Sequence, residues 1–149
     1  MAVQPPDLDA LTRDGFDRIF NQGDLAHVDH SLDPAAVDHQ EQLGSEFPAH
    51  LKQVATMLRT AFPDLRFEIQ EIIRQGETVA CRSLMTGTHE ARLPIGPMAA
   101  IEAHGAPISV QHMHFFHYTG DRVSDLWHVW DQVGLVRQMT GPTHETSGA

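Results

Sequence analysis

The sequence predicts an α+β fold, in which helices come first, a curved and mainly antiparallel sheet follows, and a short helix closes the chain. Two observations support this order. Apolar residues recur at helical spacing up to residue 62, and they alternate with polar residues from residue 65 onward. No repeat or linker divides the 149 residues, so we expect one domain over residues 1–142. Helices that cover one face of a curved sheet leave a cone with an interior cavity, a common form of small-molecule site.

The start of the chain is predicted to be helical. A helix is expected over residues 7–22, because Asp7 is a good N-cap and Gly23 favours helix termination. A short second helix is expected over residues 24–30, and a short strand over residues 36–39.

A third helix and a β-hairpin are expected next. Ser45 is the predicted cap of this helix, and Pro63 lies just past its end. Apolar residues then alternate from Leu65 to Ile73, and the turn at residues 75–77 leads to a second strand over residues 78–88.

The remaining segments are a loop, the final hairpin, a helix and a tail. Residues 89–106 carry several Gly and Pro residues, so we expect an irregular loop that forms a lid or rim. A short helix is expected over residues 132–139, and residues 143–149 are expected to be a disordered tail.

The final hairpin carries the candidate functional residues. Gly120-Asp121 suits a two-residue loop, which pairs Thr119 with Arg122. This register places His114 opposite Trp127, His112 opposite Val129, and Val110 opposite Asp131. Because residues two apart share a face, one side is predicted to carry His112, His114, Trp127 and Asp131. A slip of one residue would invert the assignment.

Composition excludes several classes of protein. The formal charge of −10 argues against nucleic acid and anionic membrane partners. No apolar run approaches the roughly 18 residues of a membrane helix. No secretory signal is visible at the N-terminus, so we expect a cytoplasmic protein. The single cysteine, Cys81, excludes an internal disulfide and a cysteine-rich metal site.

Four segments together resemble the SnoaL-like polyketide cyclases of the NTF2-like superfamily. They are Val37-Asp38-His39, Phe62-Pro63-Asp64-Leu65-Arg66-Phe67, Arg82 with Thr86-Gly87-Thr88-His89, and Gly120-Asp121-Arg122-Val123 leading to Trp127 and Asp131. The resemblance spans nearly the whole ordered chain. It implies an α+β cone that usually assembles through the outer face of its sheet. It also implies an intramolecular aldol ring closure on a hydrophobic, polyketide-derived carbonyl compound.

The resemblance also implies site residues. Asp131 matches the aspartate that acts as acid and base in the family, and His39 matches a pocket histidine. For the assisting histidine on the penultimate strand, His112 and His114 both remain candidates. A single carboxylate with a raised pKa can move both protons of an aldol closure, so no metal and no organic cofactor is expected. The substrate-contacting residues are predicted to be His114, Trp127, Val129, Phe67 and Ile69.

Other interpretations remain open. Asp131 is also well placed to cap the last helix, and the two histidines could be hydrogen-bonded core residues. Asp38 and His39 point to opposite faces if their segment is extended, so one of them is expected to enter the cavity, and His39 is the preferred candidate. A His-x-His metal site is the rival interpretation, but the predicted register leaves only two histidines on one face. A related isomerase, hydratase or hydroxylase, or a non-catalytic binding module, is the alternative function.

Self-association is expected, as a dimer or a tetramer. The face opposite the predicted pocket is too apolar and aromatic to remain in water. It is predicted to carry Gln111, Met113, Phe115, His117, Leu126, His128 and Trp130.

Overall fold

The computed structural model describes residues 2–41 and 46–141. In chain order the elements are α1 (Leu8–Phe16), the π-helix η1 (Asp17–Asn21), α2 (His27–Ser31), β1 (Leu32–Asp38), α3 (Phe47–Ala61), β2 (Arg66–Gln75), β3 (Thr78–Thr88), the 3-10 helix η2 (Gly96–Ala100), β4 (Pro107–Thr119), β5 (Arg122–Trp130) and α4 (Gln132–Met139). The predicted α+β fold is confirmed.

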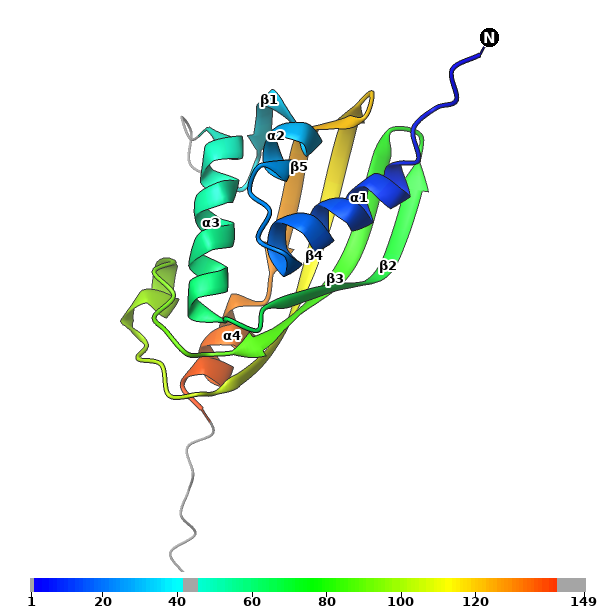
Figure 1. The fold of residues 1–149 in the computed structure, drawn as a ribbon. Coiled ribbons are helices and arrows are strands. Elements are labelled where there is room, and N and C mark those ends of the chain that lie inside the picture. The colour runs from blue at the N-terminus through cyan, green and yellow to red at the C-terminus, as the bar shows by residue number, and fades with distance from the viewer. Residues whose placement is uncertain (1, 42–45, 142–149) are drawn as a thin grey trace, which may run out of the picture.

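The five strands form one sheet in the order β1-β5-β4-β3-β2. β1 runs parallel to β5, and the other three pairings are antiparallel. The sheet is strongly curved, and α1 and α3 lie on the same side of it, with α4 at one end (Figure 1). This arrangement encloses the space in which the candidate site lies.

The first predicted helix is present but changes its winding. Asp7 caps it as predicted, since its side chain accepts a hydrogen bond from the Ala10 amide at 3.1 Å. After Phe16 the chain continues as a π-helix instead of an α-helix. Asn21 then exchanges two hydrogen bonds with the backbone of Phe67, at 2.7 and 3.0 Å. The π-helix thus ends at Asn21, whose side chain is hydrogen-bonded to β2. Local sequence does not reveal this tertiary contact.

Several other boundaries differ from the prediction. The second helix is shorter, and the strand expected over residues 36–39 begins at Leu32 and ends at Asp38. Pairing with β5 extends this strand backward. The predicted cap Ser45 and the predicted tail lie outside the described residues. The predictions of β3 and of α4 are confirmed residue for residue.

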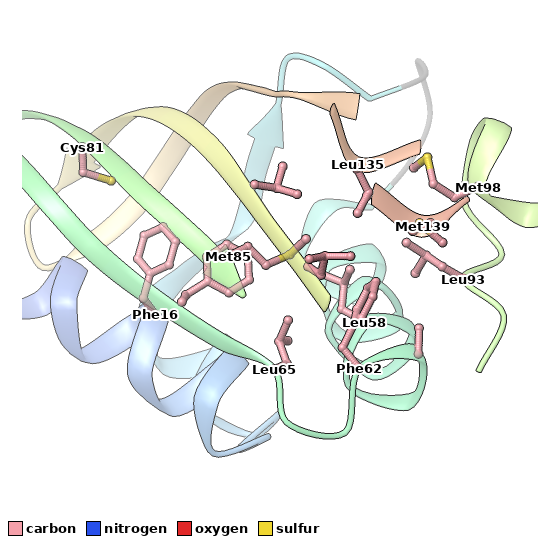
Figure 2. Packing of buried hydrophobic residues seen from close by; sticks show 14 residues of the cluster. Phe16, Leu58, Phe62, Leu65, Cys81, Met85, Leu93, Met98, Leu135 and Met139 are labelled. Atoms are coloured by element: carbon pink, nitrogen blue, oxygen red, sulfur yellow. The ribbon is translucent and has the colours of Figure 1, made fainter. Parts of the chain in front are cut away.

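The main hydrophobic core lies along the inner face of the sheet and extends to α4 at one end of the molecule. Phe16, Met85 and Leu58 pack between the helices and the sheet, as Figure 2 shows. At the other end of the same cluster lie Leu93, Met98, Leu135 and Met139, all fully buried. The loop after β3 is therefore anchored by its apolar side chains against α4.

The two central motifs of the family resemblance form a structural clamp. Asp64 accepts hydrogen bonds from the Thr88 amide at 2.7 Å and the Thr88 hydroxyl at 2.8 Å. These bonds lower the pKa of Asp64. The backbone at Gly87, the residue before Thr88, passes very close to Phe62. A Cβ at Gly87 would lie 2.9 Å from the Cβ of Phe62. The clamp joins the end of α3 to the end of β3, away from the cavity.

Candidate active site

A one-residue bulge in β5 determines which side chains face the cavity. The predicted loop at Gly120-Asp121 is confirmed, with Thr119 opposite Arg122. The register then shifts, because Tyr118 pairs with Val123 and His117 pairs with Asp125. Ser124 is the extra residue between them. A β-bulge of this kind turns every later side chain of its strand to the opposite face.

Beyond the bulge the predicted register is wrong by one residue. His114 lies opposite His128, and His112 lies opposite Trp130. All four side chains therefore share the inner face of the sheet. The prediction that His128 and Trp130 belong to the outer face is wrong for the same reason.

Trp127 and Val129 consequently face away from the cavity. Their exposed fractions are 36% and 63%. The prediction that they share the cavity face with His112 and His114 is wrong, because the bulge reverses the alternation on which it depended. The outer face at this position also carries Phe115, which is 54% exposed and pairs with Trp127.

Asp131 also lies outside the cavity and caps α4. Its amide donates to the carbonyl of Gln111, an exposed residue of the outer face, at 3.1 Å. Its carboxylate accepts a hydrogen bond from the Gly134 amide at 2.8 Å. The predicted placement of Asp131 as the base of the pocket is wrong, and the alternative interpretation as a helix cap is the one that the structure supports.

His39 is on the outer face as well. Its Nε2 lies 2.9 Å from Oδ1 of Asp125, and its ring stacks on Trp127 with centroids 4.1 Å apart. The hydrogen bond to His39 is the main reason that the pKa of Asp125 is lowered. The prediction of His39 as a pocket residue is wrong, because side chains alternate along β1 and it is Asp38 that points inward.

A cavity of about 280 Å³ lies between the helices and the inner face of the sheet. Three of the predicted site residues line it: His112, His114 and Phe67. Ile69 lies next to the cavity lining but packs into the adjoining core instead. The lining is mostly apolar, and its titratable side chains are Asp38, Glu41, His50, His112, His114, Tyr118 and His128.

A buried carboxylate and a half-buried imidazole, those of Asp38 and His128, form a hydrogen-bonded pair in the cavity wall. Oδ2 of Asp38 lies 2.8 Å from Nε2 of His128, and Oδ1 accepts the Gln40 amide at 2.9 Å. The Gln40 side chain in turn accepts the backbone N–H of His128 at 3.1 Å. Asp38 is only 8% exposed. These contacts fix the imidazole orientation and favour the tautomer with its proton on Nε2.

Sequence reasoning missed this pair, although one signal was available. If the strand is extended back to Leu32, then Leu32, Ala36 and Asp38 share its buried face. A carboxylate on a buried strand face needs a partner, and a histidine on the neighbouring strand supplies one.

His112 and His114 continue the row of imidazoles from His128. The ring centroids are 5.7 Å apart for His112 and His114, and 5.5 Å apart for His114 and His128, with nearly parallel planes. Burial lowers the pKa of His112 to about 3, and it lowers the pKa of His114 well below its usual range. Both rings are therefore neutral near pH 7. Nε2 of His112 and Nδ1 of His114 are buried, and neither has a hydrogen-bond partner in the part of the chain that the structure describes.

The inner face carries three histidines, His112, His114 and His128, whereas the sequence predicted only two there. A metal site is therefore less easily excluded by the number of histidines. Their stacked rings, however, do not converge on a common point. Within residues 2–41 and 46–141, no three His, Cys, Asp or Glu side chains are grouped to hold a metal ion. Absence of a metal stays a prediction.

No helix among the described residues is both long and apolar enough to cross a membrane. No protein with a curated description matches the sequence.

Solved structures share the fold at low sequence identity. TsrD from Streptomyces laurentii is 20% identical, covers 93% of this chain and 98% of its own, and has a TM-score of 0.77. IdmH from Streptomyces antibioticus, a proposed polyketide cyclase, is 22% identical over 90% and 99% of the two chains, with a TM-score of 0.73. AclR from Streptomyces galilaeus, a proposed hydroxylase, is 21% identical over 89% and 95%, also with a TM-score of 0.73.

A family profile matches most of the chain itself, over residues 10–139. Because it covers most of the chain, this match shows that the chain belongs to the SnoaL-like polyketide cyclase family.

Proposed function

We propose that the protein is a cofactor-free enzyme that closes a ring in a hydrophobic carbonyl compound by an intramolecular aldol reaction. The observation that supports this proposal most directly is the hydrogen bond between the buried Asp38 and His128 in the wall of a mostly apolar cavity. Such a pair is a general base that needs no metal. Family membership favours this reaction but does not by itself specify the chemistry.

His128 is the proposed acid and base. Because Nε2 bonds to Asp38, the neutral ring carries its free lone pair on Nδ1. This nitrogen takes a proton from the carbon next to a substrate carbonyl, and the Asp38 carboxylate stabilises the imidazolium that results. The enolate carbon then attacks a second carbonyl of the same molecule and forms the new C–C bond. The alkoxide oxygen recovers the proton from Nδ1, so the reaction is balanced without a redox step.

His112 and His114 are the proposed hydrogen-bond donors to the enolate oxygen. A neutral imidazole has one N–H, and the low pKa values keep both rings neutral. A donor already held in a buried site needs no reorganisation as charge develops on the substrate. Their two buried nitrogens without partners are consistent with a ligand that supplies the missing hydrogen bonds.

The cavity also limits the substrate. About 280 Å³ lies at the lower end of the range for small-molecule sites, which favours a compact molecule over an extended polycyclic one. Phe16, Phe20 and Phe67 supply an aromatic wall for its apolar part.

Deuterium exchange of 2-tetralone, a two-ring ketone, tests the first step. The protein should accelerate exchange of the protons next to the carbonyl, followed by NMR in D₂O. His128→Gln should lower the accelerated rate about 10²- to 10⁴-fold, the usual contribution of a general base. Asp38→Asn should lower it in the same direction, because a neutral amide stabilises the imidazolium less well.

His39→Gln is the matched control, since His39 also bonds to an aspartate but lies on the outer face. It should leave the rate unchanged. A full rate in His128→Gln would refute the assignment of the base, and no acceleration by the intact protein would count against catalysis of this kind.

A further inference from the structure

The cavity wall offers acidic groups but no fixed positive charge. Its carboxylates are Asp38 and Glu41. Within the part of the chain that the structure describes, no Lys or Arg lines the cavity. A ligand carboxylate or phosphate would therefore lose its hydration without gaining a permanent counter-ion, which is unfavourable.

The two carboxylates differ in how completely they are used. Both oxygens of Asp38 accept hydrogen bonds, one from Gln40 and one from His128. Glu41 bonds through Oε1 to Nδ1 of His50 on α3. Its second oxygen, Oε2, is buried and has no hydrogen-bond partner among residues 2–41 and 46–141. Asp38 therefore has a hydrogen-bond donor on each carboxylate oxygen, whereas Glu41 has one buried carboxylate oxygen that can still accept a hydrogen bond.

The backbone holds Glu41 at the cavity. Its amide donates to the Asp38 carbonyl at 3.2 Å, in the turn that follows β1. Its side chain is only 14% exposed and is tied to α3 through His50. A buried acceptor without a partner is costly, and a donor that reaches it recovers that cost.

We propose that Glu41 is a specificity-determining residue, whose Oε2 accepts a hydrogen bond from a hydroxyl or ammonium group of the ligand. The same wall disfavours ligands that carry a carboxylate or a phosphate. This inference rests on the proposed function in one respect, since both require a small molecule in this cavity. It does not depend on the aldol chemistry or on His128 as the base.

Four naphthalene probes of nearly equal size test the inference on the full chain. They are 2-naphthylmethanol, 2-naphthylmethylamine, 2-methylnaphthalene and 2-naphthoate, with affinities measured by calorimetric titration. The alcohol or the amine should bind roughly ten- to a hundredfold more tightly than 2-methylnaphthalene, the range for a hydrogen bond to a charged group. 2-Naphthoate should bind most weakly. Which of the first two binds more tightly identifies a hydroxyl or an ammonium ligand.

Two variants of Glu41 distinguish the contribution of its hydrogen-bond acceptor to ligand binding from the contribution of its negative charge. Glu41→Leu removes the acceptor and should abolish the preference over 2-methylnaphthalene. Glu41→Gln keeps an acceptor of the same size without the charge, so it should weaken the amine more than the alcohol. Glu68→Gln removes the same charge from an exposed position on β2 and should change nothing. If Glu41→Leu fails to fold in a thermal melt, Glu41→Gln still carries the test.

The possible failures are distinguishable. Equal binding of 2-methylnaphthalene and the two donor-bearing probes would overturn the role of Glu41 alone. Tightest binding of 2-naphthoate would overturn the exclusion of anions. Failure of all four probes to bind would overturn the small-molecule function, and this inference with it.

Discussion

Two histidine–aspartate pairs of nearly equal length lie on opposite faces of the same sheet. Asp38 and His128 are 2.8 Å apart on the inner face, and Asp125 and His39 are 2.9 Å apart on the outer face. The Asp38 side chain is 4% exposed, whereas the Asp125 side chain is 32% exposed. The hydrogen bond is thus of the same kind, but only the inner pair lies in the wall of a mostly apolar cavity, where solvent screens its buried carboxylate less.

The difference shows that two hydrogen-bonded pairs of the same kind can lie in quite different surroundings, and only the inner one lines the cavity. The sequence analysis predicted His39, of the outer pair, as a pocket residue. It placed His128, of the inner pair, on the outer face. What separates the pairs is the bulge at Ser124 together with the alternation of β1, which sends Asp38 and His128 inward and His39 outward.

Deletion of Ser124 should have the largest effect on stability, because the bulge at Ser124 determines which side chains of β5 face the interior. Removing the extra residue turns the rest of β5 over, so that Leu126, His128 and Trp130 leave the interior. We expect a loss of more than about 4 kcal/mol of unfolding free energy, or failure to fold. Ser124→Ala keeps the bulge and should cost only about 1 kcal/mol, for its hydroxyl bonds. Chemical denaturation measures both, and a stable deletion variant would contradict the role of the bulge.

The inner histidines should make stability depend on pH. Below pH 6.5 the unfolded chain protonates these rings, whereas folded His112 stays neutral down to about pH 3. The unfolded state then binds more protons, so stability falls as the pH drops through this window. Each ring should contribute a slope of up to about 1.4 kcal/mol per pH unit.

Denaturation curves between pH 4 and 7 measure this slope, and His114→Phe should flatten it. Phe16→Leu is the packing control, since Phe16 contacts the His114 ring without titrating. It should lower stability equally at every pH. An unchanged slope in His114→Phe would mean that burial does not oppose protonation of this ring.

The outer face should mediate self-association. Its exposed apolar side chains on β4 and β5 are Met113, Phe115, Trp127 and Val129, a set that differs from the one the sequence predicted. We propose that a second copy of the chain covers them, which would give a dimer at micromolar concentration by light scattering. Phe115→Lys should weaken the dimer at least tenfold, whereas Val133→Lys, at an exposed position of α4, should not. A monomeric wild-type protein would contradict the proposal.

Asp131 should show the smallest effect, in keeping with a cap. Asp131→Ala should lower the unfolding free energy by about 1 kcal/mol, and Asp131→Asn should change it little, because asparagine caps about as well. Neither should alter 2-tetralone exchange. Loss of exchange in Asp131→Asn with an intact fold would restore the catalytic interpretation of this residue.

The sequence by itself determined the order of elements, because helical and strand periodicities are local properties. β3, α4 and the Gly120-Asp121 loop follow from alternation and turn chemistry alone. The inward direction of His112 and His114 was also correct, since no bulge interrupts β4 before them. The clamp motifs pointed to the family, although Asp64 and Thr88 serve the fold and not the cavity.

Only the tertiary structure decided which acid reaches the cavity. The bulge at Ser124 depends on how β5 pairs with β4 on one side and with β1 on the other. The π-turn at Asn21 likewise depends on its contact with Phe67. A shift of one residue leaves local propensities unchanged but reverses a strand's two faces. For that reason Asp131 lies outside the cavity, and the proposed base is the Asp38–His128 pair, which is assembled from strands about 90 residues apart in sequence.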